Sequence, residues 1–315
     1  MKNIKRTFVL VIVTVVLCMS CSIVLTYNKT KSLMRDAYEN ELRVESGMIS
    51  GAIENSFLRP ITVSETMSKD LIMYKILNVN TKEEAMVVEQ EASEYLTSIR
   101  NGFGYSMVFA VNDASKAYYT CDGISKYIAP ETNDQDIWYK VFMERDTDKP
   151  YLLDVDIDAV NNWALSVFVN TAVYDEHGRY IGLCGVGVDM TELQRLLERY
   201  ERIYDVKIDL INSEGLIQVD TDAANIENAY IKIDSPELYS DGECYYEVGE
   251  NVSRTITYID DLGWYLVVQN NSSLVSNVYS LLIPSVICMA AGVLLICAVF
   301  FFMYRSKTEN ADSGK

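Results

Sequence analysis

The sequence predicts an α+β protein in which a long N-terminal helix carries two tandem antiparallel-sheet modules, flanked by two transmembrane helices. Three observations lead to this fold class. Two uncharged apolar segments lie near the ends of the 315-residue chain, a helical apolar stripe follows the first of them, and a strand-and-turn pattern repeats at an offset of one hundred residues. Apolar residues make up 49% of the chain and charged residues 23%, which is typical of a folded protein.

The two apolar segments are long enough to span a bilayer. Residues 8–26 form an uncharged run of nineteen residues and residues 281–304 one of twenty-four, and about 20 apolar residues cross the hydrocarbon core. Basic residues flank both runs on their outer sides, so the positive-inside rule places both chain ends in the cytoplasm. A cleaved signal peptide is the alternative for residues 8–26, but the apolar core of such peptides usually has only roughly 7–15 residues.

We therefore predict a two-pass protein of the cell membrane. Its parts are a cytoplasmic N-terminus (1–7), a transmembrane helix (8–26), an extracellular segment (27–280), a second transmembrane helix (281–304) and a cytoplasmic tail (305–315). The net charge is −18, of which the first seven residues carry +3 and the last eleven +1, so residues 8–304 carry −22. This charge excludes a nucleic-acid partner, because phosphate neutralisation needs Lys and Arg. The two apolar segments make the lipid bilayer a partner.

Helical spacing dominates residues 27–100. An apolar stripe recurs at spacings of four and seven residues through Met34, Tyr38, Leu42, Ile49, Ile53 and Phe57. Pro60 is expected to interrupt this helix, since proline removes a backbone donor and clashes one turn back, and the pattern resumes as far as Ile76. Thr81–Glu84 matches a capping box and predicts a further helix to about Ile99.

From Tyr105 onward the pattern changes to strands, and it repeats. An offset of one hundred places Val111 on Ile211 and Asn112 on Asn212, each within an apolar strand, an Asn-led turn and a returning strand. Each half then closes with a second hairpin. The alternative explanation is that hairpins with Asn, Asp and Gly turns resemble one another in any antiparallel protein.

The repeat predicts two modules. The hairpins that close the two halves turn at Asp175–Gly178 and at Asp260–Gly263, and an amphipathic helix over Thr191–Glu201 separates them. We predict a membrane-distal module at residues 101–190 and a membrane-proximal module at residues 202–272.

Cysteine usage argues against a metal site. Of seven cysteines, only Cys121, Cys184 and Cys244 lie outside the apolar segments. No Cys-x-x-Cys pair or Cys/His cluster occurs among them, so the sequence supplies no zinc ligand set, and we expect no metal and no cofactor. One disulfide with one thiol left over is an alternative to three buried free thiols, which the sequence favours.

Enzymatic functions lack the necessary residues. The only histidine, His177, lies in a hairpin turn, where a solvated side chain is expected, and no GxSxG, Walker or GxGxxG motif stands in a fitting context. Asp154, Asp156 and Asp158 alternate in a run that lacks the Gly and Glu of an EF-hand loop, so we interpret it as a strand with an exposed acidic face. We predict that the protein is not an enzyme.

The order and spacing of these parts resemble the double Cache (dCache) extracellular sensor domains of bacterial receptors, most closely the sensor halves of transmembrane diguanylate cyclases and chemoreceptors. The resemblance covers nearly all of residues 8–304. It is carried by Leu58–Met67 with Asp70, by Asp136–Tyr139, by Phe168–Asn170 and by Gly185–Asp189. It implies PAS-like sheet modules and a small ligand bound in the membrane-distal module.

The resemblance also implies site residues. Amino-acid-binding members of the family hold the ligand's carboxylate with an Arg two positions before a Trp-Tyr pair, and its amino group with an Asp that ends the last strand. Trp138 and Tyr139 match the pair, and Asp189 matches the terminal Asp. The arginine position is Asp136, which would repel the carboxylate that an Arg would bind.

An acidic and aromatic site predicts a cationic ligand. If Asp136 and Asp189 face one cavity with aromatic rings, an amine is favoured by charge and by cation–π attraction, whereas an amino acid, a purine or a sugar stays an alternative. The candidate ligand-binding residues are Asp136, Trp138, Tyr139, Asp189, Tyr151, Tyr119 and Tyr127.

Each candidate also has a structural alternative. Asp136 is a favoured type of residue for capping the helix that follows it, and Trp138 and the tyrosines can belong to the core. Asp189 shares a strand face with Gly185 and Gly187, which leave space for a ligand or another backbone.

We therefore predict a membrane-anchored extracellular small-molecule sensor. The chain ends eleven residues after Tyr304, so we expect it to lack its own output domain and to signal through a homodimer or a separately encoded partner. A truncated or split sensor half of a diguanylate cyclase, chemoreceptor or histidine kinase is the first alternative. A surface solute-binding protein that does not signal is the second.

Overall fold

The computed structural model describes residues 2–145, 148–158, 164–233, 239–248, 253–270 and 274–312. The chain forms two compact units. One comprises Met1–Arg43, Val248–Ser253 and Asn270–Lys315, and the other Val44–Glu247 and Arg254–Gln269. The second unit contains the two sheets, and it is the unit that holds the candidate site.

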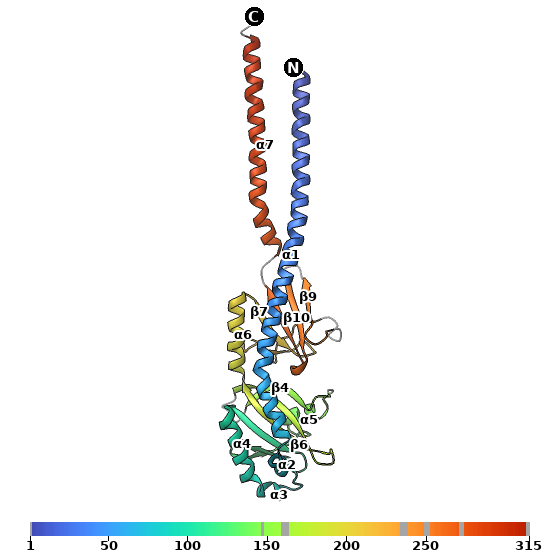
Figure 1. Cartoon of the computed structure of the whole chain (residues 1–315), viewed down its shortest axis with the longest axis vertical. Coiled ribbons are helices and arrows are strands. Elements are labelled where there is room, and N and C mark those ends of the chain that lie inside the picture. Colours follow the sequence, from blue (N-terminus) through green and yellow to red (C-terminus); the bar gives the residue numbers. More distant parts are fainter. Residues whose placement is uncertain are drawn as a thin grey trace. The chain divides into compact units, whose positions relative to one another are not determined.

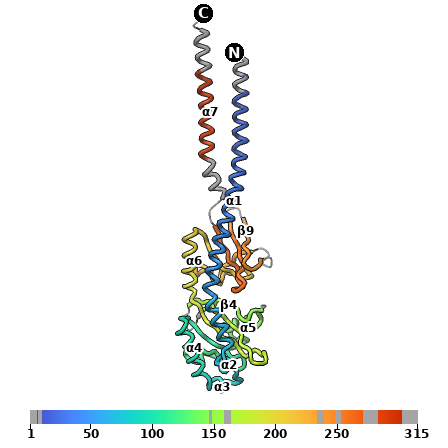
Figure 2. Tube along the Cα trace, in the orientation of Figure 1, coloured from blue at the N-terminus to red at the C-terminus, as the bar shows by residue number. Residues whose placement is uncertain are grey.

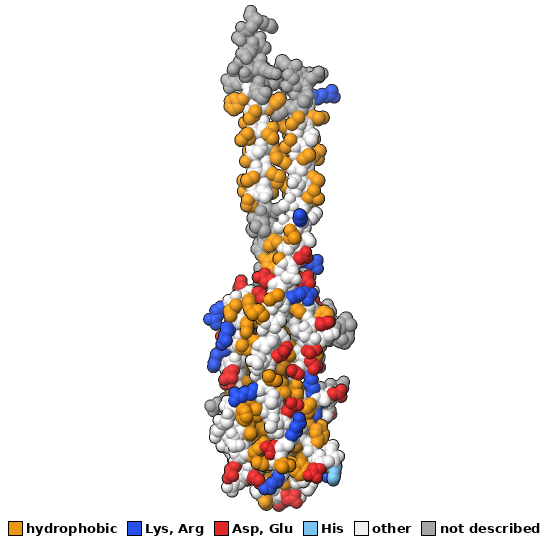
Figure 3. All heavy atoms as spheres, in the orientation of Figure 1, with side chains coloured by type: hydrophobic (Ala, Val, Ile, Leu, Met, Phe, Trp, Pro, Cys, Tyr) orange, Lys and Arg blue, Asp and Glu red, His pale blue; other side chains and the backbone are white. Residues whose placement is uncertain are grey.

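The first unit contains two long apolar helices. The first part of α1 (Lys2–Ser68) and all of α7 (Leu274–Asp312) belong to it. Within the described residues, both helices have the length and composition to cross a membrane, with windows of mean hydropathy 2.4 in α1 and 2.7 in Ile283–Phe302. Figure 3 shows hydrophobic side chains exposed along the described turns of both helices. This agrees with the two spans predicted from the sequence.

In the second unit, α1 continues without a break through Pro60 and ends at Ser68, so the predicted interruption at Pro60 is wrong. A proline inside a helix removes a single backbone donor. Phe57 and Ile61, on either side of it, are buried, and this packing outweighs one lost hydrogen bond. The chain turns instead at Asp70, whose carboxylate accepts a hydrogen bond from the backbone N–H of Ile72 (2.9 Å) and caps α2 (Leu71–Leu77).

The N-cap predicted at Thr81 is present, and the reciprocal bond from Glu84 reaches the residue before the cap instead of the cap itself. The Thr81 hydroxyl accepts a hydrogen bond from the Glu84 N–H (3.2 Å), and the Glu84 carboxylate accepts one from the Asn80 N–H (2.8 Å). The helix expected as far as Ile99 is two helices, α3 (Lys82–Val87) and α4 (Glu89–Phe103). Gly104 ends α4 in a left-handed conformation (φ +79°), as glycine readily does.

The first module is a six-stranded antiparallel sheet with the order β3-β2-β1-β6-β5-β4. Its strands are β1 (Met107–Asn112), β2 (Ala117–Thr120), β3 (Gly123–Tyr127), β4 (Tyr151–Asp158), β5 (Ala164–Tyr174) and β6 (Tyr180–Asp189). Helices α2 and α4 pack on one face of this sheet. The short helix α5 (Ile137–Met143), which follows the 3-10 turn η1 (Asp134–Asp136), packs on the other face (Figure 1).

Helix α6 (Met190–Tyr204) leads into the second module, a five-stranded antiparallel sheet with the order β8-β7-β11-β10-β9. Its strands are β7 (Lys207–Ile211), β8 (Ile217–Val219), β9 (Cys244–Val248), β10 (Ser253–Ile259) and β11 (Trp264–Asn270). The run β2-β1-β6-β5 of the first sheet corresponds to β8-β7-β11-β10 of the second. This shared connectivity explains the sequence repeat.

The two asparagines of the repeat shape equivalent turns. The Asn112 side-chain oxygen accepts from the Ser115 N–H (2.6 Å), and that of Asn212 accepts from the Glu214 and Leu216 N–H groups (3.0 Å each). Asn112 is also buried, and its amide donates to the carbonyls of Leu77 (2.5 Å) and Val79 (3.1 Å). It therefore holds the end of α2 against the first sheet, whereas the described side-chain hydrogen bonds of Asn212 stay within its own turn.

The second half of α1, shown in blue beside both modules in Figure 2, contacts both sheets. The Ser64 hydroxyl lies 2.7 Å from that of Thr171 in the first sheet, and the Ser46 hydroxyl lies 3.1 Å from that of Thr257 in the second. The Phe57 ring meets the Trp264 ring edge-on at 6.0 Å. One face of each sheet is therefore covered by α1.

The cysteines of the second unit differ in burial. Cys184 is a buried free thiol whose sulfur donates to the Ser64 carbonyl (3.7 Å), and burial raises its pKa. The predicted burial is confirmed for Cys184, whereas Cys121 and Cys244 are only half-buried. Both lie at the ends of strands near the surface, which the sequence pattern does not distinguish from the core.

Candidate functional site

A cavity of about 500 Å³ lies on the face of the first sheet that α5 partly covers. Strands β1 to β5, η1 and α5 all contribute to its walls. It is lined by Met107, Phe109, Tyr118, Ser125, Lys126, Asp134, Gln135, Ile137, Trp138, Val141, Asp154, Val155, Asp156, Ile157, Phe168 and Asn170. A volume of this size accommodates a small organic ligand.

Four aromatic rings form one wall of the cavity. Phe109 stacks on Tyr118 with their centroids 5.4 Å apart, and Trp138 meets Phe109 and Tyr118 edge-on at 6.4 and 6.2 Å. Phe168 meets Phe109 edge-on at 5.9 Å. These contacts fix the rings as a preformed apolar surface.

Two glycines of β6 make room for these rings. A Cβ atom at Gly185 would lie 2.7 Å from the Phe109 ring and 2.4 Å from the Val169 carbonyl oxygen, and one at Gly187 would lie 3.1 Å from the Phe168 ring. The space that the glycines leave open is thus filled by side chains of the cavity wall. Any larger residue at these positions would displace the aromatic surface.

The acidic wall of the cavity comes from β4. Asp154 pairs with Phe168 and Asp156 with Ser166 across the β4–β5 ladder, so both carboxylates project from the cavity face. Burial raises the pKa of Asp154 to about 7, with further contributions from Asp156 and Glu227, and burial also raises the pKa of Asp156. The predicted exposed acidic face is therefore wrong for Asp154, which is half-buried in the cavity wall, and confirmed for Asp156, which lines the cavity but is exposed.

Asp136 lies beside this cavity but is fully engaged. Its carboxylate accepts hydrogen bonds from the Lys126 ammonium (2.5 Å), the Ala129 N–H (2.9 Å) and the Asn133 side-chain amide (2.9 Å). Burial acts to raise its pKa, but these hydrogen bonds outweigh burial and hold the pKa below its ordinary value. Its side chain makes no capping hydrogen bond to α5, so the capping alternative does not apply.

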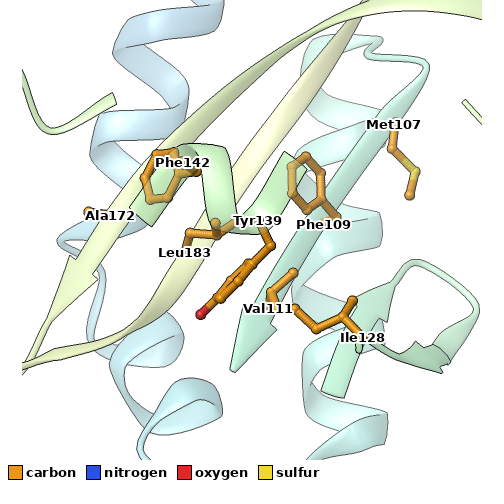
Figure 4. Packing of buried hydrophobic residues seen from close by; sticks show 8 residues of the cluster. All are labelled: Met107, Phe109, Val111, Ile128, Tyr139, Phe142, Ala172 and Leu183. Atoms are coloured by element: carbon orange, nitrogen blue, oxygen red, sulfur yellow. The ribbon is translucent and has the colours of Figure 1, made fainter. Parts of the chain in front are cut away.

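Tyr139 lies in the hydrophobic core between α5 and the sheet, among residues that include Val111, Ile128 and Leu183 (Figure 4). Its hydroxyl donates to the Asp113 carboxylate (2.7 Å) and accepts from the Tyr180 hydroxyl (3.2 Å). Burial and these neighbours raise its pKa.

The remaining candidates lie elsewhere in the module. Tyr119 is completely buried on the opposite face of the sheet, where its hydroxyl donates to the Ala85 carbonyl (3.3 Å). The Lys82 ammonium lies over the Tyr127 ring, 4.4 Å from its centroid. Tyr151 is buried on β4, and the Asp189 carboxylate caps α6 by accepting from the Thr191 N–H (2.8 Å). Of the seven candidates, Trp138 lines the cavity, and the other six lie outside its lining.

Sequence reasoning therefore missed the carboxylates that line the cavity. The alternation of Leu153 and Val155 with Asp154 and Asp156 does predict a strand with one acidic face. It does not reveal that η1 and α5 lie across that face, because this depends on packing between segments distant in the sequence.

The comparisons with known proteins concern the fold. No family model matches the chain. The structure is similar to the sensory domain of the Campylobacter jejuni chemoreceptor Tlp3 with isoleucine bound, at 14% sequence identity and a TM-score of 0.53, covering 78% of this chain and 98% of that one. It is also similar to the ligand-binding domain of the Pseudomonas fluorescens chemoreceptor CtaA in complex with L-isoleucine, at 15% identity and a TM-score of 0.51, covering 80% and 98%. The chain thus has the dCache sensor-domain fold, which confirms the resemblance seen in the sequence.

Proposed function

We propose that the protein is an extracellular sensor that binds a small organic cation, such as an amine, in the cavity of the first module. The observation that carries this proposal is the pair Asp154 and Asp156, which lines the same cavity as the aromatic rings, with Asp154 next to Phe168 in the β4–β5 ladder. Carboxylates and ring faces are the groups that bind ammonium ions in proteins. Charge-assisted hydrogen bonds contribute about 1.5–3 kcal/mol each and cation–π contacts about 0.5–2 kcal/mol.

An amino acid is the competing ligand, since Tlp3 and CtaA are chemoreceptor domains with isoleucine bound. An amino acid needs a cation for its carboxylate as well as an anion for its ammonium group. Lys126 is the one basic residue that lines this cavity in the described part of the chain, and its ammonium already pairs with Asp136. This arrangement favours a ligand without a carboxylate.

The membrane helices supply the remaining part of the proposal. The protein would cross the cell membrane twice with both ends in the cytoplasm, and the sheet modules would face outward. Ligand binding would be passed to a second copy of the chain or to a separately encoded partner. Capture of a solute without signalling is the alternative, and it would show as binding that changes no partner's activity in reconstituted membranes.

Calorimetric titration of the full-length protein in lipid nanodiscs tests the ligand class. A panel of amines, amino acids, purines and sugars should give binding of amines. Asp156→Asn should weaken that binding by about 10- to 100-fold, because one charge-assisted hydrogen bond is lost.

Glu131→Gln is the matched control. Glu131 is an exposed carboxylate of the same module that lies outside the cavity lining, so its loss should leave amine affinity within about twofold if the effect is local. Binding of amino acids alone, or equal effects of the two substitutions, would contradict the proposal.

A further inference from the structure

Asn170 is a polar residue in an apolar part of the cavity wall. It is only 2% exposed, and across the ladders of β5 it pairs with Leu152 on β4 and with Gly185 on β6. The Phe109 ring occupies the space over Gly185, and Ala172 follows Asn170 on the same face of β5. Phe109 and Ala172 both belong to the apolar cluster of Figure 4. An aliphatic residue would therefore pack at this position at least as well as an amide does.

The side-chain amide of Asn170 lacks a hydrogen-bond partner for its oxygen. Within the described residues, the Oδ1 atom is buried and accepts no hydrogen bond. Among the described buried side-chain atoms without a partner, it is the one that belongs to a residue of the cavity lining. A buried polar atom that stays unpaired destabilises a folded protein, and folds pair nearly all such atoms. An unpaired amide in a cavity wall therefore points to a partner that is not part of the chain.

Asn170 lies close to the acidic pair of the cavity. Asp154 pairs with Phe168 on β5, and Asn170 follows Phe168 by two residues, so all three side chains project from the cavity face. Two residues along a strand span about 6.6 Å. The cavity thus presents an anionic position and a neutral hydrogen-bonding position, at a separation that one small organic molecule can span.

We propose that the ligand is an amino alcohol, an amine with a hydroxyl group at its far end, whose ammonium group binds Asp154 and Asp156 and whose hydroxyl group binds the Asn170 amide. The inference rests on the proposed function and names its ligand class. A hydroxyl group both donates and accepts hydrogen bonds, so it matches either end of an amide. Rotation about the last side-chain bond of Asn170 is enough to turn the oxygen toward the ligand, because torsions of this type have broad minima.

Other groups at the far end of the ligand fit this position less well. A carboxylate needs a cation, and Lys126, the one basic residue of the described lining, already pairs with Asp136. A carboxylate also only accepts hydrogen bonds, so it cannot serve the Asn170 oxygen, and an alkyl group leaves the whole amide unpaired. Asn170 should therefore select for a hydroxyl group over both.

Titration calorimetry of the full-length protein in nanodiscs tests the inference with linear amino alcohols from 2-aminoethanol to 6-amino-1-hexanol. Each is compared with the n-alkylamine in which a methyl group replaces the hydroxyl group. At one or two chain lengths, the amino alcohol should bind about three- to tenfold more tightly, which is the effect of one neutral hydrogen bond. At the other lengths it should bind no better than its alkylamine, because its hydroxyl group does not meet the amide.

Asn170→Leu closely retains the side-chain shape and removes the amide. It should abolish the preference for amino alcohols and leave n-alkylamine affinity within about twofold of the original value. It should also leave the thermal unfolding midpoint of the ligand-free protein unchanged or raise it, since an apolar group replaces an unpaired buried amide. Asn101→Leu, at an exposed position of α4 outside the cavity lining, is the matched control and should keep the preference.

The other outcomes separate the two proposals. Alkylamines that bind as tightly as the amino alcohols at every length, or an equal loss of both ligands in Asn170→Leu, would overturn this inference and leave the proposed amine sensor intact. A lower unfolding midpoint of Asn170→Leu would also overturn it, because the amide would then stabilise the ligand-free fold. The comparison of ligands on the unsubstituted protein decides the matter if this variant does not fold. A complete lack of amine binding would overturn the proposed function, and this inference with it.

Discussion

The carboxyl group of Asp154 projects from β4 into the cavity opposite Phe168, and its pKa is raised to about 7 by burial, Asp156 and Glu227. Lys126 lowers the pKa of the neighbouring Asp156. Asp154 therefore changes charge near neutral pH, whereas an ordinary aspartate stays ionised there. The attraction between Asp154 and a cationic ligand in the cavity would therefore depend on the pH.

Amine affinity should fall as the pH drops through about 7. An alkylamine stays protonated between pH 6 and 8, so the change comes from the protein, where protonation of Asp154 removes one anionic partner. Titrations at pH 6, 7 and 8 should show affinity rising with pH. Asp154→Asn should bind more weakly at pH 8 and lose most of this dependence, and an unchanged pH profile in that variant would contradict the assignment.

The raised pKa of Asp154 also makes the stability of the ligand-free protein depend on pH. The direction is opposite to that of amine affinity, because stability falls as the pH rises. A carboxyl group with a raised folded-state pKa binds its proton more tightly in the folded than in the unfolded state. It therefore contributes stability at low pH that is lost as the pH rises from about 4 to about 7. Asp209 in the second module shares this behaviour, since burial also raises its pKa to about 7.

At the residue scale, the sequence predicted Trp138 as a site residue, but it did not predict that Asp154 and Asp156 line the same cavity. The Trp-Tyr pair was recognisable from the family resemblance, and yet Tyr139 faces the core while Trp138 faces the cavity. The pairing of Asp136 with Lys126 was not predictable, because an ion pair between side chains ten residues apart depends on how the loop between β3 and η1 folds.

Elements were more predictable than sites. The helical stripe through Ile49, Ile53 and Phe57 is buried as expected, because apolar spacing directly reflects which face of a helix meets the core. The end of α1 was misplaced because proline is a strong helix breaker only when packing does not compensate for its missing donor. No local sequence signal reports the packing around Pro60.

A comparison of Asn112 with Asn212 tests whether the Asn112 side chain stabilises the contact between α2 and the first sheet. Asn112→Ala should lower the free energy of unfolding by about 1–3 kcal/mol, because the buried carbonyls of Leu77 and Val79 lose their donor. Asn212→Ala loses only turn hydrogen bonds, so it should cost less. Thermal unfolding of both variants, followed by circular dichroism, measures the difference. A cost at Asn212 equal to that at Asn112 would contradict the fastening role.

At the scale of the whole second unit, the two modules meet through α1 and through a direct ion pair. The Lys149 ammonium lies 2.8 Å from the Asp260 carboxylate, between the segment before β4 and the turn before β11. Lys149 also donates to the Asp260 backbone carbonyl. The strand that bears the cavity's acidic wall is therefore linked, at its other end, to the second sheet.

A double-mutant cycle of Lys149→Ala and Asp260→Ala should give a coupling energy toward the upper end of about 0.2–1 kcal/mol, since Lys149 is only 26% exposed. Lys140 and Glu144, an exposed pair 4.0 Å apart within the first module, provide the control cycle and should give less. Denaturant unfolding at two salt concentrations is the measurement. A coupling at Lys149–Asp260 no larger than the control would show that this ion pair does not help to join the modules.

The repeat and the α+β class were predictable at this scale, because hairpin signals recur at a fixed spacing. The cavity was not, because it arises where α5, η1 and β4 meet, and the second module has no described helix equivalent to α5. The shared strands β1, β2 and β5 supply part of the cavity lining, whereas η1 and α5, which complete it, have no described counterpart in the second module.

The position of β4 at the edge of its sheet has one more consequence. An edge strand exposes unpaired backbone groups to which a strand of another molecule can add, and charged side chains on such a strand discourage this aggregation. Asp154 and Asp156 stand on this edge, so they would keep the protein from associating through β4 while also forming the cavity wall. Replacing both aspartates with neutral residues should therefore lower the solubility of the folded protein as well as remove the negative charge of the cavity wall.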